Sequence, residues 1–266
     1  MRWLLPLILA GCAPAMDTGR GGIVSLNPCA DQLLLALVPP ERIAAISHYS
    51  QDPGATSISL ATARRFRTTA GTAEEVIALT PELVVATSFT PPATRDAFAR
   101  AGLPTLYLDS PTTIAASRAQ VTELAQAVGA EARGAALDAR IEAAVARARS
   151  GAPPVPALLY ISGDLASGGG TLLDELMALA GFHDAAADYG LAMTGTLPVE
   201  TILAKPPAVI LTPDAGGRTA MIRRRLLQRT GARVREVAFP RVLVNCGGPT
   251  IPAALARLSA IRRQIG

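Results

Sequence analysis

Short apolar runs alternate with helical patterns along most of this 266-residue sequence. Strand-like runs lie at residues 23–26, 43–46, 83–86, 105–108, 157–161, 209–211, 234–238 and 241–244. Helical patterns lie between most of them, at residues 31–37, 73–79, 93–101, 172–179, 199–203, 219–229 and 251–263. Alternation of this kind predicts α/β units on mainly parallel sheets.

The middle of the chain breaks the alternation. Residues 112–149 have no strand pattern and read as alanine-rich helix, with a junction at Gly129 and Ala130. The second helix, residues 131–149, would be about 28 Å long at 1.5 Å per residue, which is the scale of a small domain. We expect it to join two lobes rigidly, because a flexible linker would contain Gly and Ser. An ordinary surface crossover helix is the alternative.

The two flanks of this helix contain similar segments. EEVIALTPELVVAT (residues 74–87) and VETILAKPPAVILT (residues 199–212) share a glutamate followed seven positions later by a proline. In both, we expect the proline to end a short helix and to precede a buried strand. The repeat predicts two lobes of similar construction.

The N-terminus has the features of an export signal. Arg2 precedes a brief apolar run at residues 3–9, which is too short to span a bilayer. The following segment, LAGC, resembles the lipobox of bacterial lipoproteins and marks Cys12 for lipidation. We expect a signal peptide at 1–11, a tether at 12–22 and a periplasmic protein anchored by lipid to a membrane. An apolar terminus with a chance cysteine is the alternative.

Composition and motifs exclude several functions. The formal charge is +4, the arginines are mostly scattered and aromatic residues make up 4%, which does not fit nucleic-acid binding. No nucleophile-elbow, phosphate-loop, dinucleotide or zinc-protease motif occurs, so we expect no enzyme. The triplet at residues 168–170 is either an anion cradle or a strand-to-helix loop. With only His48 and His183, a site for bare zinc or manganese is not expected.

The ordered set of segments resembles a known family. After the export signal come GIVSLNPCADQLLLAL, RIAAISHYS, EEVIALTPELVVATS, AGLPTLYLD, the long helix, GGGTLLDELMALAG, VETILAKPPAVILT and CGGPTIPAALARL. Together they resemble the helical-backbone substrate-binding proteins of ABC importers, which take up cobalamin and ferric siderophores. The resemblance implies two similar α/β lobes (23–111 and 151–266), joined by helices at 112–150 that include one long rigid helix. It also implies a ligand cleft between the lobes.

The same resemblance implies where the ligand binds. Ligands of open α/β sheets bind at the carboxyl ends of the strands. The expected ligand-binding residues are Asn27, Cys29, His48, Tyr49, Phe89, Ser162, Thr194 and Cys246. The alternative to ligand binding is a packing role for Tyr49 and Phe89 and an ordinary surface position for His48. The exposed run at Arg64, Arg65 and Arg67 is either solvated or holds an anionic chelate.

The two cysteines of the body of the protein map to the expected cleft. Cys29 and Cys246 are either a disulfide, which an oxidising compartment permits, or small buried residues. A bond between them would tie the lobes together.

One glutamate per lobe is expected to contact the permease. Glu74 and Glu200 match the positions at which relatives insert an exposed glutamate among permease arginines. The alternative is a helix-terminal role, since an acid in the first turn of a helix interacts favourably with its dipole. Thr72 and Glu75 form an expected capping box, which leaves Glu74 free.

The sequence therefore predicts the substrate-binding component of an ABC importer. It would carry a ferric siderophore or a cobalamin-like corrinoid to a permease and its ATPase, with no cofactor of its own. Trp3 lies in the signal and is the only tryptophan, which disfavours cobalamin because relatives that bind it line the cleft with tryptophans. The alternatives are a non-catalytic envelope lipoprotein and a chelate-modifying enzyme.

Overall fold

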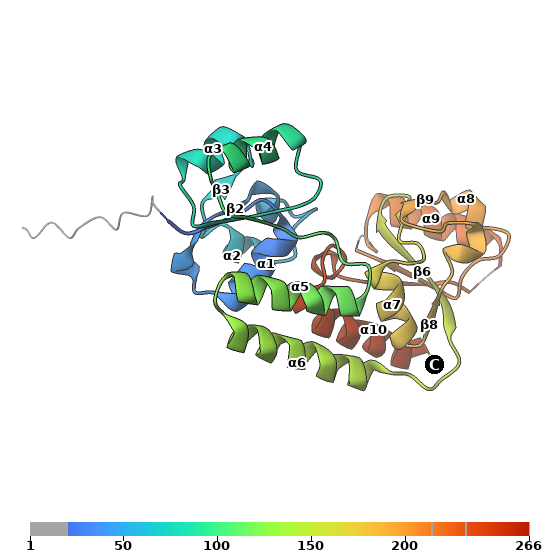
Figure 1. Ribbon diagram of the computed structural model, residues 1–266. Coiled ribbons are helices and arrows are strands. Elements are labelled where there is room, and N and C mark those ends of the chain that lie inside the picture. Colours follow the sequence, from blue (N-terminus) through green and yellow to red (C-terminus); the bar gives the residue numbers. More distant parts are fainter. Residues whose placement is uncertain (1–20, 214, 232, 266) are drawn as a thin grey trace, which may run out of the picture.

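The computed structural model describes residues 21–213, 215–231 and 233–265. Two α/β lobes lie side by side, and helices run beneath both of them (Figure 1). The predicted fold class, with two lobes and mainly parallel sheets, is confirmed.

The first lobe is built on a five-stranded sheet in the order β3-β2-β1-β4-β5, and every pair in it is parallel. Its strands are β1 (Ile23–Ser25), β2 (Ile43–Ser47), β3 (Thr68–Thr69), β4 (Leu83–Ala86) and β5 (Thr105–Tyr107). The central strands β1 and β4 are almost wholly buried, as expected for a parallel sheet covered on both faces.

The second lobe is built on a six-stranded sheet in the order β11-β10-β6-β7-β9, with β8 also paired to β6. Its strands are β6 (Val155–Ser162), β7 (Leu165–Ala166), β8 (Phe182–Asp184), β9 (Gly195–Thr196), β10 (Val209–Thr212) and β11 (Arg235–Ala238). The pairs of β7 with β6 and with β9 are antiparallel, and the others are parallel.

The helices follow the expected pattern closely. They are α1 (Pro28–Leu37), α2 (Leu60–Ala63), α3 (Ala73–Ala78), α4 (Pro92–Arg100), α5 (Ile114–Ala127), α6 (Glu131–Ala148), α7 (Leu172–Leu179), α8 (Val199–Ile202), α9 (Arg218–Arg229) and α10 (Ile251–Ile265). The repeat is visible in the structure, because α3 leads into β4 and α8 into β10, and each of these strands lies inside its sheet.

Helices α5 and α6 form the brace between the lobes. The chain crosses from β5 to the second lobe, where the Ile114 amide donates to Glu175 Oε2 on α7 over 2.6 Å. Helix α5 then returns to the first lobe, where Arg42 Nη1 donates to the Val128 carbonyl at its end over 2.6 Å. Helix α6 crosses back with 18 residues, a length of about 27 Å.

The apolar core is continuous through this brace. One buried cluster joins residues of both lobes, among them Leu34 of α1, Ile141 of α6 and Leu258 of α10. Two smaller clusters cover the outer faces of the sheets, one in each lobe. The lobes are therefore held by shared packing as well as by chain connections.

Three local predictions are corrected. Residues Arg241–Leu243 form a 3₁₀ helix instead of a strand, because Pro240 precedes them and the Leu243 amide bonds the Pro240 carbonyl. The helix expected from residue 31 begins at Pro28, where proline suits the first turn. The capping box is half formed: Thr72 accepts from the Glu75 amide, but Glu75 Oε2 accepts from the Thr69 hydroxyl and the Ala70 amide.

Candidate ligand-binding site

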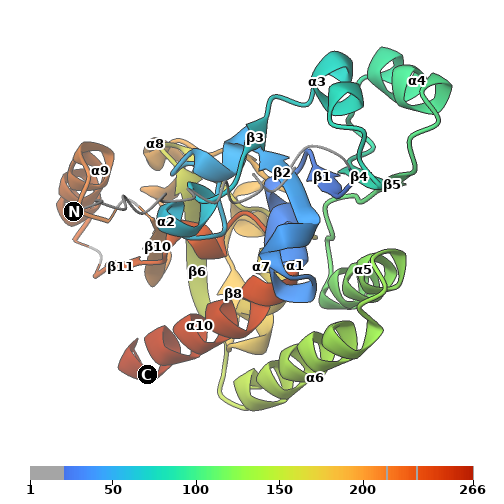
Figure 2. The ribbon, with the colours of Figure 1, turned by 90° about the vertical axis from the view of Figure 1, so that its left-hand side faces the viewer.

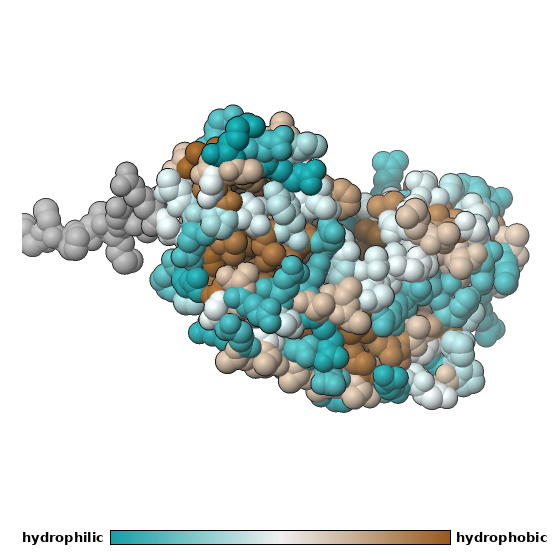
Figure 3. Space-filling model, viewed as in Figure 1, coloured by the Kyte–Doolittle hydropathy of each residue, from teal (hydrophilic) through white to brown (hydrophobic). Residues whose placement is uncertain are grey.

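A cavity of about 290 Å³ lies between the lobes, near the carboxyl ends of their strands. The first lobe contributes Cys29 at the start of α1, and the segment after β5 contributes Ser110–Thr112. The second lobe contributes the end of β6, the start of α7 and the segment 244–247. Figure 3 shows the surface hollowed between the two lobes, with apolar residues at depth.

The turn between β1 and α1 places Cys29 at the cavity. Asn27 has extended backbone angles and caps the helix, with its Oδ1 accepting from the Cys29 amide over 2.9 Å. Pro28 follows as the first helical residue, where its missing N–H costs no helical bond. The polar turn after the first strand therefore does face the space between the lobes.

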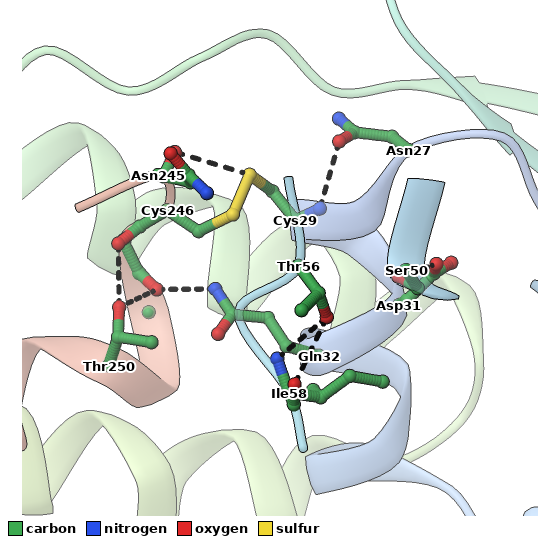
Figure 4. The surroundings of a disulfide bond; sticks show 12 residues. Asn27, Cys29, Asp31, Gln32, Ser50, Thr56, Ile58, Asn245, Cys246 and Thr250 are labelled. Atoms are coloured by element: carbon green, nitrogen blue, oxygen red, sulfur yellow. Dashed lines mark hydrogen bonds between the residues drawn. A yellow bond between two sulfur atoms is a disulfide. The ribbon is translucent and has the colours of Figure 1, made fainter. Parts of the chain in front are cut away.

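Cys29 and Cys246 are joined by a disulfide at the edge of this cavity, with Cα atoms 5.3 Å apart (Figure 4). Two hydrogen bonds beside it join the segment 245–247 to the first lobe, one at α1 and one at Gly54. Gln32 Nε2 donates to the Gly247 carbonyl over 2.7 Å, and Asn245 Nδ2 donates to the Gly54 carbonyl over 3.4 Å. The start of α1 is thereby fixed to the segment that leads into α10.

The start of α7 forms the opposite wall. Thr171 caps the helix through the Asp174 amide, and its hydroxyl donates to the Gly168 carbonyl over 3.0 Å. The Gly170 amide already donates to Asp174 Oδ2, and a Cβ on Gly168 would lie 2.2 Å from the Met193 carbonyl oxygen. The glycine triplet is thus a tightly packed strand-to-helix loop, and its geometry does not favour the anion cradle.

The cavity lining combines neutral polar groups with apolar side chains. It contains the hydroxyls of Ser110, Thr112, Ser167, Thr171 and Thr194, the amide of Asn245, and the apolar Ile161, Leu172, Leu173 and Val244. No charged side chain is among the residues that line it. Among the described residues, no group of three or more His, Cys, Asp or Glu side chains is placed to hold a metal ion.

A buried carboxylic acid lies behind the first-lobe wall. Asp31 Oδ2 accepts from the Ser50 hydroxyl over 2.5 Å and from the Ser47 amide over 3.1 Å, while its Oδ1 is buried without a hydrogen-bond partner. Burial raises the pKa of Asp31 to about 7, against the lowering effect of these bonds. The acid thus links α1 to the 3₁₀ turn at His48–Gln51.

The structure brings only some of the predicted ligand residues together. Cys29, Thr194 and Cys246 line the cavity, whereas Asn27, His48, Tyr49, Phe89 and Ser162 do not. His48 and Tyr49 stack on each other with ring centroids 4.1 Å apart, and the His48 ring is held by the Thr69 carbonyl.

Tyr49 and Phe89 are 51% and 82% exposed, so neither is packed in the core. Phe89 is largely open to solvent, and Tyr49 is half exposed beside the His48 ring. Ser162 at the end of β6 is exposed as well.

Sequence reasoning missed the segment Ser110–Thr112 and the α7 cap at Ser167 and Thr171. The segment Ser110–Thr112 lies at the expected end of the first lobe, and it is where the chain crosses to the second lobe. Thr171, with Asp174 three residues on, has the spacing of a helix N-cap and would have been the signal for the α7 cap.

Glu74 and Glu200 are both exposed and lie on α3 and α8. These helices occupy the side of the molecule that faces away from α6 in both ribbon views (Figures 1 and 2). Neither glutamate forms an ion pair within the described residues. Cys12 lies outside the described residues, within which no helix is long and apolar enough to cross a membrane.

Comparisons with known proteins agree with this architecture. Residues 23–233 match a family model described as periplasmic binding protein. The chain is similar to the solved structure of the periplasmic heme-binding protein RhuT from Roseiflexus sp. RS-1 in apo form. The identity is 25% and the TM-score 0.69, with 93% of this chain and 98% of that chain covered.

Two further solved structures share the fold. The periplasmic heme-binding protein BhuT in complex with two hemes is 24% identical, with a TM-score of 0.72 over 92% of this chain and 98% of that chain. The periplasmic vitamin B12 binding protein BtuF of Vibrio cholerae is 19% identical, with a TM-score of 0.68 over 91% of this chain and 96% of that chain. No curated protein matched the sequence. Since the family model covers most of the sequence, the chain belongs to the periplasmic binding protein family.

Proposed function

We propose that the protein is the substrate-binding component of an ABC importer, which captures a metal chelate in the periplasm and delivers it to a permease and its ATPase. The observation that carries this proposal is the interlobe cavity, which collects loops from both sheets within the fold of the family. The protein binds its cargo without chemical turnover.

The chemistry of the lining supports a bulky ligand whose surface carries little charge. Hydroxyl groups suit the polar edges of a chelate, and the leucine and valine side chains suit its apolar faces. The cavity of about 290 Å³ is at the small end for such a ligand, so part of the chelate would project out of it.

Haem, a ferric siderophore and a cobalamin-like corrinoid are the candidate cargoes. Solved structures with this fold bear the names of heme-binding and vitamin B12-binding proteins, which places haem first for testing. Lack of tryptophan after Trp3 still argues against cobalamin.

Delivery requires docking, which we assign to Glu74 and Glu200. Both are exposed carboxylates without an ion pair among the described residues, on corresponding helices of the two lobes. Each glutamate could therefore bind a separate permease subunit. We also propose that lipidation at Cys12 anchors the protein in the periplasm.

The test is ligand binding by the purified protein. Hemin, a ferric hydroxamate siderophore and cyanocobalamin are titrated separately, and melting temperature and absorbance are recorded. A ligand at a hundred times its Kd stabilises the folded state by about 2.7 kcal/mol, which is a shift of several degrees.

Matched variants connect binding to the cavity. Thr194→Phe fills the cavity and should abolish the shift, whereas Thr122→Phe on the exposed face of α5 should leave it intact. No shift with any chelate would favour the envelope lipoprotein, and conversion of a chelate by the pure protein would favour the enzyme.

A further inference from the structure

Helix α9, on the outside of the second lobe, presents a stripe of arginines and apolar side chains to solvent. Arg218, Met221, Ile222, Arg225 and Arg229 are all exposed, and their spacing of three and four residues puts them on one face. The opposite face, with Ala220, Arg223 and Leu227, is buried against the sheet. We call the five exposed residues the α9 stripe.

Helix stability accounts for only one charge of the α9 stripe. Arg229 lies in the last turn, where a cation interacts favourably with the helix dipole. Arg218 is the first helical residue, where a cation opposes the dipole, and no acid lies in the first turn. No ion pair within the described residues involves the three stripe arginines.

A carboxylate on the strand β11 is already engaged. The side chain of Glu236 is buried and pairs with Arg223 Nη2 over 2.9 Å, with Arg224 farther away at 3.9 Å. Among the described residues, no acid pairs with the three positive charges of the stripe, which lie along about 17 Å of helix.

Apolar side chains accompany these charges. Met221 and Ile222 are each 50% exposed and flank the arginines on the same face. A single exposed apolar residue needs no explanation, but an arginine face with adjoining large apolar groups is the composition of helices that lie in a membrane interface.

We propose that the α9 stripe docks on an anionic phospholipid surface, with the arginines on the headgroup phosphates and Met221 and Ile222 inserted between headgroups. Each arginine held near an anionic membrane strengthens binding about fivefold. The position of the stripe fits this partner. Figures 1 and 2 place α9 beside α8, and both helices pack against the same apolar cluster.

A protein docked through Glu74 and Glu200 would therefore hold the α9 stripe close to the bilayer around the permease. This argument depends on the proposed function, whereas vesicle binding requires neither ligand nor permease.

The experiment uses residues 12–266 with Cys12→Ser, so that neither the apolar segment at residues 3–9 nor an attached lipid contributes to binding. Its co-sedimentation is measured with vesicles of phosphatidylethanolamine and 30% phosphatidylglycerol, and with vesicles of phosphatidylcholine alone. We expect binding to the anionic vesicles that weakens with salt, and about a hundredfold loss in the triple variant R218Q/R225Q/R229Q.

The control variant R140Q/R147Q/R149Q removes the same charge from exposed arginines at α6, on the opposite side of the molecule, and should bind as the parent does. The double variant M221S/I222S should weaken binding while retaining its salt dependence. Circular dichroism confirms that each variant is folded.

Equal binding by the two triple variants would overturn the proposal, as would equal binding to the neutral vesicles. Loss of ligand uptake in R218Q/R225Q/R229Q without any vesicle binding by the parent would also overturn it, and would assign the stripe to an acidic protein surface. A failure of ligand binding in the earlier test leaves the vesicle result unaffected, so the two proposals are tested separately.

Discussion

Asp31 is a carboxylic acid held almost wholly out of water, between α1 and the turn that carries His48 and Tyr49. Because its pKa is raised from 3.8 to about 7, the folded state binds a proton that the unfolded state has released across that interval. The free energy of unfolding should therefore fall as the pH rises from about 4 to about 7, and level off above it.

Asp31→Asn should remove the part of this pH dependence that comes from Asp31 and raise stability at pH 8, since each pKa unit corresponds to roughly 1.4 kcal/mol. The part that comes from Asp184, whose pKa burial raises to about 6, should remain. Urea denaturation at several pH values measures the effect. Asp96→Asn on the exposed side of α4 is the control and should retain the parent profile. If the free energy of unfolding of Asp31→Asn changed with pH in the same way as that of the parent protein, the proposed role of this acid would be contradicted.

At the residue level, the sequence predicted which loops meet but not which side chains converge. The Asn27–Cys29 turn was correctly expected to face the other lobe, since it follows a buried strand directly. His48 and Tyr49 lie in such a loop as well, but their rings stack on each other, a contact that no spacing reveals.

Among the elements, α5 and α6 approach closely at Gly134, where a Cβ would lie 2.5 Å from the Ala125 Cβ. Alanine normally stabilises a helix interior relative to glycine by about 1 kcal/mol. Here Gly134→Ala should instead destabilise the protein by roughly 1–3 kcal/mol, because the two helices must separate.

Thermal unfolding followed by circular dichroism tests this prediction. Gly151→Ala, where a Cβ would meet open space, serves as the control and should be close to neutral. An increase in melting temperature for Gly134→Ala would mean that the helix pair adapts without cost.

Long elements were predictable and very short ones were not. Buried strands such as β4 and β10 are continuous apolar runs, and the 18-residue α6 has a helical pattern. The repeat around Glu74 and Glu200 located equivalent elements in both lobes. Strands of two residues, namely β3, β7 and β9, are too short for any pattern. Their positions depend on pairing with distant segments.

On the scale of the whole molecule, the matching positions of Glu74 and Glu200 lead to a transport prediction. Charge reversal at either site should lower uptake of the chelate while leaving its Kd unchanged, because both sites are remote from the cavity. Glu123→Arg on the exposed face of α5 is the matched control. Unchanged uptake in the Glu74→Arg/Glu200→Arg double variant would refute the docking role.

The disulfide is the second feature that acts across the whole molecule. With Cys12→Ser, the chain unfolded without reductant should contain no free thiol, since Cys29 and Cys246 are bonded. Detection of two thiols with a chromogenic reagent would show that the bond does not form. Reduction should lower the melting temperature, because a bond over a separation of 217 residues restricts the unfolded chain by about 5 kcal/mol on the entropic estimate.

This bond also sets the order of maturation. Its two sulfur atoms belong to the opening turn of the first lobe and to the segment just before the last helix, so oxidation must wait until nearly the entire polypeptide has emerged from the export channel. Neither lobe can form the Cys29–Cys246 bond by itself, and protein produced in a reducing cytosol would lack this disulfide.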